Sequence, residues 1–236
     1  MKYLLITRPQ EESERFARLV KLKDYEPVIE PLLSSAYLED LILMPSKVQA
    51  IIVTSKNTLR SIEASHQTSL FHNVPFICVG EKTAESAREL GLETIDATLE
   101  DVDQLIGWIQ ENVVPEIGPL MYLHGDVVAK DLKTILEAHK YTVHHQKTYN
   151  MNESKIFSQR TVDLLQRQVF HGIVFFSPRT AHTFVNIVKK FGLEVHLAVV
   201  NALCLSQSIA DEIKGLSWKT IQVAHSPKED ALLELL

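Results

Sequence analysis

Residues 76–95 read FICVGEKTAESARELGLETI, and residues 202–221 read ALCLSQSIADEIKGLSWKTI. The two stretches align without a gap, because Cys204 follows Cys78, and Thr220 follows Thr94, by the same 126 residues (204 − 78). Each stretch contains a short apolar run, a polar loop, a helical pattern and a second short apolar run. This pattern is typical of a strand–helix–strand unit, and its repetition indicates two similar α/β domains.

The repeat extends towards the N-terminus in both copies. IIVTSKNT, from Ile51, aligns with IVFFSPRT, from Ile173, so that Ser55 meets Ser177. Each copy thus has at least three strands. The second copy lacks two of the five strands of such a sheet, and the apolar runs at residues 4–6 and 28–29 supply them. We therefore predict an α/β fold of two flavodoxin-like, doubly wound parallel-sheet domains, joined by a two-stranded linker, with one domain discontinuous.

The predicted boundaries follow from this sharing of strands. Residues 1–33 with 152–236 form the discontinuous domain, residues 38–146 form the inserted domain, and residues 34–37 and 147–151 are the crossings. Five strands are expected in the inserted domain, at 50–53, 76–79, 94–95, 120–123 and 142–143. Because the chain crosses twice, a hinge and a ligand-binding cleft between the two domains are expected.

Composition narrows the class of partner. The chain has 236 residues, of which 45% are hydrophobic and 23% charged, values typical of globular proteins. A net charge of −6 argues against a broad basic surface, and so against binding to nucleic acid or to an anionic membrane. The N-terminal apolar run, Tyr3 to Ile6, is shorter than that of a signal peptide. A cytoplasmic protein with a small-molecule ligand is expected.

Several kinds of chemistry are not expected from the motifs. The two cysteines, Cys78 and Cys204, each lie in an apolar strand, where a thiol is usually a small buried hydrophobe. His144 and His145 are adjacent on a strand and so point to opposite faces, which disfavours a metal site. The sequence contains neither G-x-G-x-x-G after the first strand nor a phosphate-binding P-loop. No metal and no cofactor are expected.

The ligand of an open α/β sheet binds beyond the carboxyl ends of the strands. Small hydroxylated residues and helix N-termini dominate these positions, and both suit an anion with many acidic groups. Another interpretation is that the Ser and Thr residues only cap helices. The candidate binding residues are Arg8, Thr54, Ser55, Asn57, Gly80, Lys82, Thr83, Gly125, Ser177, Pro178, Arg179, Ser206 and Ser208.

Eight segments, in this order, resemble the uroporphyrinogen-III synthase family. They are LLITRP at the start, VTSKN at 53–57, VGEKTAESARELGL at 79–92, YLHG at 122–125, TYN around Tyr149, FFSPRTA at 175–181, CLSQSIADEI at 204–213 and VAHSPKEDALLELL at the end. The resemblance implies a cytoplasmic, monomeric enzyme without a cofactor. Its substrate would be hydroxymethylbilane, a linear tetrapyrrole with eight carboxylates, which is cyclised to uroporphyrinogen III with loss of water and inversion of the last ring.

The resemblance also suggests two catalytic residues. Tyr149 would assist departure of the hydroxyl group, and Thr83 would bind a carboxylate or the leaving oxygen. A purely structural role for Tyr149, packed where the chain crosses between domains, is the alternative. The second copy departs from the family pattern, because Ile209 stands where many members have Thr. A non-catalytic, two-lobed cytoplasmic binding protein for an anionic ligand is the other functional hypothesis.

Overall fold

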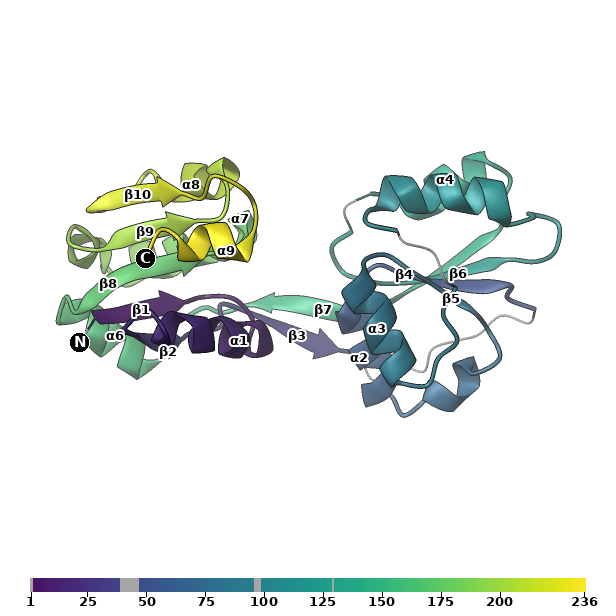
Figure 1. Ribbon diagram of the computed structural model, residues 1–236, viewed down its shortest axis with the longest axis horizontal. Coiled ribbons are helices and arrows are strands. Elements are labelled where there is room, and N and C mark those ends of the chain that lie inside the picture. The colour runs from purple at the N-terminus through teal and green to yellow at the C-terminus, as the bar shows by residue number, and fades with distance from the viewer. Residues whose placement is uncertain (1, 39–46, 96–98, 129) are drawn as a thin grey trace. The chain divides into compact units, whose positions relative to one another are not determined.

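The computed structural model describes residues 2–38, 47–95, 99–128 and 130–236 (Figure 1). These residues form two compact units. The first, called here the discontinuous unit, comprises the chain up to Ser34 together with Asn152–Leu236, and the second, the inserted unit, comprises Ser35–Met151. We propose that the two units are the two domains predicted from the sequence repeat.

The discontinuous unit has a five-stranded parallel sheet in the order β10-β9-β8-β1-β2. Read along the chain, this is the flavodoxin order 2-1-3-4-5, as predicted. Its strands are β1 (Lys2–Ile6), β2 (Tyr25–Ile29), β8 (Phe170–Phe175), β9 (Asn201–Cys204) and β10 (Thr220–Val223). Its helices are α1 (Gln10–Lys21), α6 (Gln159–Gln166), α7 (Pro178–Lys190), α8 (Gln207–Ile213) and α9 (Glu229–Leu233), with a 3₁₀ turn η2 at Glu194–Leu197.

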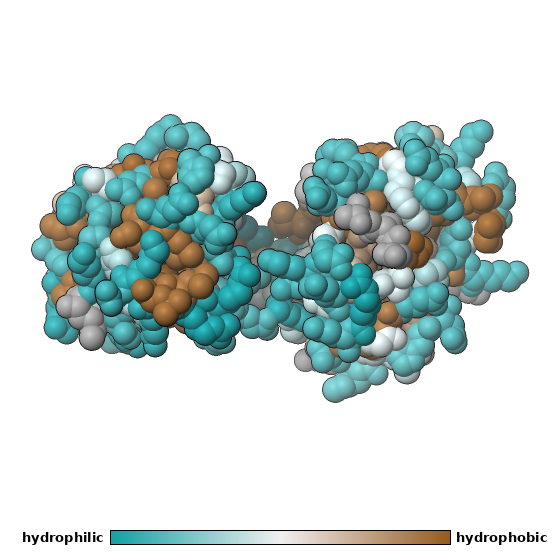
Figure 2. Space-filling model, viewed as in Figure 1, coloured by the Kyte–Doolittle hydropathy of each residue, from teal (hydrophilic) through white to brown (hydrophobic). Residues whose placement is uncertain are grey.

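The helices of this unit cover both faces of its sheet. Alternate residues of a strand point to opposite faces, so Leu5 packs in the core under α6, α7 and α8. Leu4 and Ile6 instead pack against Phe16 of α1 and Leu232 of α9. Figure 2 shows hydrophobic residues gathered on the face that carries α1 and α9, where the partly buried side chains of Leu233, Leu235 and Leu236 pack against this second core.

The inserted unit has its strands in the order β3-β7-β6-β4-β5. They are β3 (Leu33–Tyr37), β4 (Ala50–Val53), β5 (Phe76–Cys78), β6 (Leu120–Gly125) and β7 (Val143–Glu153). The helices are α2 (Lys56–Ala64), α3 (Glu81–Glu89), α4 (Val102–Asn112) and α5 (Leu132–Ala138), with a 3₁₀ turn η1 at Thr68–Phe71. Figure 1 shows α4 on one side of this sheet and α2 and α3 on the other. The buried contacts agree, because Ile51 packs with α2 and α3, and Ile52 with α4 and α5.

One strand of the inserted unit differs from the sequence prediction. Residues 94–95 form only an isolated bridge, Thr94 to Phe76, because the apolar run ends after Ile95. The fifth strand is instead β3, from the segment expected as a crossing, and it lies beside β7, where the Leu38 N–H donates to the Thr148 carbonyl at 2.9 Å. The other crossing, residues 147–151, is the continuation of β7.

The repeat is real in three dimensions, although the two copies use the chain in a different order. Strands β4 and β5 and the bridge at Thr94 occupy the places that β8, β9 and β10 occupy in the other sheet. Strands β6 and β7 then occupy the places of β1 and β2. Consequently the carboxyl end of β6, at Gly125, is the counterpart of the carboxyl end of β1, which the loop with Arg8 follows.

Candidate functional site

A cavity of about 410 Å³ lies at the carboxyl edge of the inserted sheet. Strands β4, β5 and β6 are parallel, so their carboxyl ends meet at this edge, as a ligand site in an open α/β sheet requires. Four of the predicted site residues line it: Thr54, Ser55, Gly125 and Tyr149. The other lining residues are Val79, Asp101, Val102, Asp103, Tyr122, His124, Val127, Val128 and Lys130.

Tyr149 is held by close contact with Gly125. The two residues are partners across β6 and β7, next to an irregularity in the register at His124. A Cβ atom at position 125 would lie 2.4 Å from Cζ of Tyr149 and 2.8 Å from its hydroxyl oxygen, closer than any real contact. Tyr149 is only 7% exposed. Glycine at position 125 is therefore required for this placement of the phenol ring.

A second phenol, Tyr122, shares the cavity wall with Thr54. Burial raises the pKa of Tyr122, a hydrogen bond with Thr54 lowers it, and the nearby Tyr149 raises it further. Tyr122 is therefore a neutral hydroxyl group at neutral pH. The sequence analysis did not select Tyr122, because it lies inside the apolar run LMYL and has the pattern of a core residue. The hydrogen bond between Tyr122 and Thr54 depends on the pairing of β6 with β4, which the sequence does not predict.

His124 links the cavity wall to β7. Its Nδ1 lies 2.7 Å from the carbonyl oxygen of Gly125, and its Nε2 lies 3.0 Å from Nδ1 of His145. Its ring also stacks on that of Tyr122, with centroids 4.8 Å apart. The sequence does not predict this pair, because His124 and His145 are 21 residues apart and meet through the pairing of β6 with β7.

The rim of the cavity carries charges of both signs. Asp101 is the N-cap of α4 and accepts a hydrogen bond from the Gln104 N–H at 2.8 Å. Lys130 forms an ion pair with Asp103. Among the lining residues that the structure describes, Lys130 is the one permanent cation, and its charge is already neutralised by Asp103.

The first-copy residues on α2 and α3 do not line this cavity. Gly80, with φ of 81°, is the N-cap of α3, and its N–H donates to the Leu99 carbonyl at 2.7 Å, so this N–H is not available to a ligand. Thr83 is buried on α3, and Lys82 beside it is exposed. Asn57 accepts a hydrogen bond from Arg60 at 3.2 Å. The structure thus separates Thr83 from the cavity that contains Tyr149.

Two predicted serines are helix caps. Ser55 accepts a hydrogen bond from the Asn57 N–H at 3.2 Å, and Ser177 accepts one from the Thr180 N–H at 3.2 Å. Pro178 is the first residue of α7, where its missing N–H has no cost. Ser55 therefore caps α2 and Ser177 caps α7. Their side chains fix the helix start and leave the other first-turn N–H groups to a ligand.

The remaining candidates lie at the carboxyl edge of the discontinuous sheet. The hydroxyl oxygens of Ser206 and Ser208 are 2.9 Å apart at the start of α8. Arg179 forms an ion pair with Glu153 at 2.8 Å. Arg8 forms one with Glu229 at 2.8 Å, and its guanidinium lies 4.2 Å from the Phe176 ring centroid. Both predicted arginines are therefore already paired with carboxylates.

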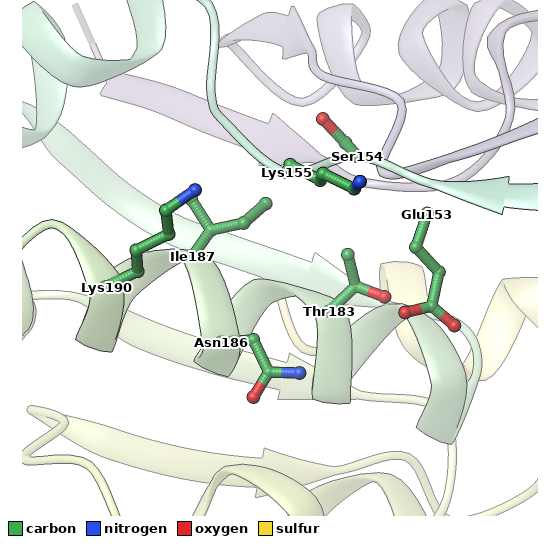
Figure 3. Close-up of a pocket in the computed structure, with 7 residues that line it drawn as sticks. All are labelled: Glu153, Ser154, Lys155, Thr183, Asn186, Ile187 and Lys190. Carbon is green, nitrogen blue, oxygen red and sulfur yellow. The ribbon is translucent and has the colours of Figure 1, made fainter.

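A second cavity, of about 210 Å³, lies between α7 and residues 153–155 of the discontinuous unit. Lys155 and Lys190 line it, which would suit an anion. Figure 3 shows, however, that Asn186 points away from Lys155 and Ser154, so the polar groups do not converge. Glu153, which also lines it, already holds Arg179. This cavity is a weaker candidate than the one at Tyr149.

In the described part of the chain, three or more His, Cys, Asp or Glu side chains do not gather in a way that could hold a metal ion. Nor does any helix in the same residues have the length and apolar character needed to cross a membrane.

The fold is similar to two solved structures. One is the crystal structure of uroporphyrinogen-III synthetase from Helicobacter pylori 26695, with a TM-score of 0.67 and 18% identity, covering 100% of this chain and 98% of that one. The other is a mutant uroporphyrinogen III synthase from the extremely thermophilic bacterium Thermus thermophilus, with a TM-score of 0.54 and 14% identity, covering 100% of this chain and 97% of that one. These likenesses establish the two-domain α/β fold.

Sequence comparison identifies the family. A "Putative uroporphyrinogen-III synthase" of Methanocaldococcus jannaschii is 32% identical over 89 residues, which are 36% of this chain and 37% of that relative's length. The match therefore spans only about a third of that curated relative. The sequence profile of the family described as "Uroporphyrinogen-III synthase HemD" matches residues 14–234, nearly the whole chain. The chain belongs to the uroporphyrinogen-III synthase family.

Proposed function

We propose that the protein cyclises hydroxymethylbilane to uroporphyrinogen III, with loss of water and inversion of the last pyrrole ring, as the family assignment implies. The observation that carries the proposal is the packing of Tyr149 against Gly125, which places a phenol at the wall of a cavity at the carboxyl edge of a parallel sheet. The cavity also contains the hydroxyl groups of Thr54 and Tyr122. We propose no cofactor.

The chemistry of the first step needs little from the protein. The bond between the terminal carbon and its hydroxyl oxygen breaks, and the pyrrole nitrogen supplies electron density to the carbon. The oxygen leaves as water, because it keeps the electron pair of the broken bond and receives a proton. Tyr149 is the proposed donor of a hydrogen bond or proton to this oxygen. Closure then inverts the last ring, through a spirocyclic intermediate.

Selectivity depends on holding the chain in one folded conformation. Without guidance the linear tetrapyrrole closes to the uninverted isomer, so positioning supplies the function. We propose that the substrate carboxylates bind to first-turn N–H groups of α2 and α7, the helices that Ser55 and Ser177 cap. Arg8, Arg179, Ser206 and Ser208 are proposed to bind carboxylates as well. The candidates that do not line this cavity remain proposed substrate contacts: Thr83 for a carboxylate or the leaving oxygen, and Asn57, Gly80 and Lys82 for the carboxylates.

We propose that one substrate molecule binds to the carboxyl edges of both sheets, and the sequence repeat supports this. We likewise propose that the protein acts as a monomer in the cytoplasm, with a small molecule as its partner and without nucleic acid or membrane. Gel filtration at assay concentration tests the first of these statements, and a mass of about one chain is expected.

A single assay tests the function. Hydroxymethylbilane is generated enzymatically in the presence of the protein, and the uroporphyrinogen isomers are resolved by chromatography. The expected product is isomer III, formed faster than the spontaneous closure. Isomer I alone, at the uncatalysed rate, would reject the synthase. If the protein then still bound the substrate, it would be a non-catalytic binding protein with two lobes.

A further inference from the structure

His124 and His145 form a coplanar imidazole pair joined by a hydrogen bond. Their ring planes differ by 8°, and the ring centroids are 5.3 Å apart. Nε2 of His124 and Nδ1 of His145 are 3.0 Å apart. Each nitrogen lies about 1.1 Å from the centre of its own ring, and the two nitrogens are 3.0 Å apart. These distances reach the 5.3 Å between the ring centroids only if the rings meet edge to edge, as in a linear N–H···N bond. The rings are therefore not stacked face to face.

The surroundings decide where the protons of this pair lie. Nδ1 of His124 is 2.7 Å from the Gly125 carbonyl oxygen, and a carbonyl only accepts. Nδ1 of His124 must therefore carry a proton, which leaves its Nε2 as an acceptor in the neutral ring. His145 must then donate from its Nδ1, and its Nε2 is left as an acceptor on an exposed side chain.

This arrangement accepts one proton without losing a hydrogen bond. A proton added at Nε2 of His145 leaves both existing bonds in place. The proton between the rings can then move to Nε2 of His124, which shifts the positive charge to the cavity wall and still preserves both bonds. A second proton would remove the last acceptor and break the pair. Two coupled imidazoles thus take up one proton as a unit.

Charged groups around the pair act in opposite directions. Burial lowers the pKa of His124 most, the Gly125 carbonyl bond opposes this, and His145 and Lys147 lower it further. On the other side Asp131, at the start of α5, interacts with His145, and this interaction contributes to the lowered pKa of Asp131 after its bonds to Thr134. Without a ligand, burial and the neighbouring positive charges therefore disfavour the charge on His124.

A carboxylate in the cavity would reverse this preference. Of the residues that line the cavity with His124, Tyr122 carries a neutral phenol, Asp101 is acidic, and Lys130 is paired with Asp103. A bound anion would attract the shared charge to His124, because among the described lining residues Lys130 is already paired with Asp103 and His124 is the side chain that can take up a further positive charge. This shift of charge requires only that the proton between the two rings moves from Nδ1 of His145 to Nε2 of His124.

We propose that the His124–His145 pair is a pH-dependent carboxylate-binding element of the cavity, which strengthens binding of a polycarboxylate as one proton is taken up. The proposal deepens the proposed synthase function and rests on it for the identity of the natural ligand. His124 lines the cavity, whereas His145 acts through His124 and is a positioning residue. The affinity should fall about three- to fivefold from pH 6 to pH 8, the size of one partly exposed charge interaction.

The binding test uses uroporphyrin III, an octacarboxylate, as the probe, with its fluorescence recorded at pH 6, 7 and 8. His145→Gln removes Nε2 of His145, which accepts the added proton, and keeps an N–H donor for His124. His144→Gln is the matched control, because the neighbouring residue on β7 is also exposed and points to the opposite face. The wild type and His144→Gln should lose affinity as the pH rises, and His145→Gln should show a flat profile. Equal slopes in His145→Gln and His144→Gln would overturn the proposal.

A second measurement tests the pair without a ligand. Long-range ¹H–¹⁵N spectra of the histidine rings in the protein should show Nδ1–H tautomers for both residues at pH 8 and uptake of one shared proton as the pH is lowered. Two independent, ordinary titrations would overturn the proposal. The isomer assay on the wild type separates the two hypotheses: isomer I alone rejects the synthase, while pH-dependent binding that His145→Gln abolishes would still support the pair.

Discussion

The Cβ position of Gly125 lies 2.4 Å from Cζ of Tyr149, so the smallest residue on β6 creates the space for the largest polar side chain on β7. The place of Gly125 at a strand end and the family resemblance at Tyr149 predict these two residues separately, and the structure joins them in one contact. Their contact means that a change at either one alters the position of the phenol.

Gly125→Ala should therefore disable the site without unfolding the chain. The added methyl group displaces the Tyr149 ring, and we expect turnover to fall at least tenfold, as loss of one well-positioned acid–base group would cause. Gly107→Ala is the control, because nothing lies within 4 Å of its added Cβ atom. Isomer-resolved kinetics and urea unfolding check the two variants. Normal turnover in Gly125→Ala would show that the exact ring position is unimportant.

Tyr149→Phe tests the hydroxyl group itself. The ring keeps its packing against Gly125, so stability should change little, while turnover should drop by about an order of magnitude or more. Tyr141→Phe should behave in the opposite way, because the Tyr141 hydroxyl lies 3.0 Å from the carbonyl oxygens of Ile109 and Val113. That variant should lose about 1 kcal/mol of unfolding free energy and keep its turnover. Near-normal activity of Tyr149→Phe would remove Tyr149 from the mechanism.

Ser55→Ala and Ser177→Ala should affect stability more than catalysis. Each removes an N-cap hydrogen bond, which is worth about 1 kcal/mol, while the backbone N–H groups that we propose as ligands remain. Ser177→Asp retains a capping oxygen and should restore the stability. Chemical denaturation and isomer-resolved kinetics check these variants together. Complete loss of activity in either alanine variant would show that the hydroxyl group contacts the substrate.

Glu229→Gln should release Arg8 for a substrate carboxylate. Glu229 now binds both Arg8 and Arg15 at 2.8 Å, and removing its charge leaves Arg8 with only the longer contact of its Nε to Glu12, at 3.8 Å, among its ion pairs in the described residues. If Arg8 binds the substrate, KM should fall about two- to fivefold, as one partly exposed ion pair allows. Glu234→Gln, which removes a more exposed charge beyond α9, is the control. An unchanged KM would indicate that Arg8 only anchors α9.

The two thiols should be unreactive in the native state. Burial raises the pKa of Cys78 to about 11 and that of Cys204 to about 12. Because the unfolded thiols ionise at about pH 8.5, this contribution to stability is complete below that pH and is lost as the pH rises towards the folded values. A thiol reagent at pH 8 should modify both residues only in urea. Rapid labelling of the folded protein would contradict their burial.

The sequence by itself determined the five strands of the discontinuous sheet and four of the five strands of the inserted sheet. The short apolar runs, the repeated strand–helix–strand stretch and the shortage of strands in the second copy indicated these strands, because each of these signals can be read along the chain. The burial of Cys78 and Cys204, which are free cysteines, was predicted correctly for the same reason. The capping of α2 and α7 by Ser55 and Ser177 is equally local, since each bond spans two or three residues.

Only the tertiary structure decided which residues meet. The pairing of β6 with β7 brings Gly125 to Tyr149 and His124 to His145, and the repeat does not predict it because residues from different strands are involved. The sequence also did not predict that β3 pairs with the edge of β7. Nor did it predict that Thr94 forms only an isolated bridge to Phe76. Contacts between distant segments depend on register and on the depth of each side chain. These are set when the sheet assembles and its strands are brought side by side.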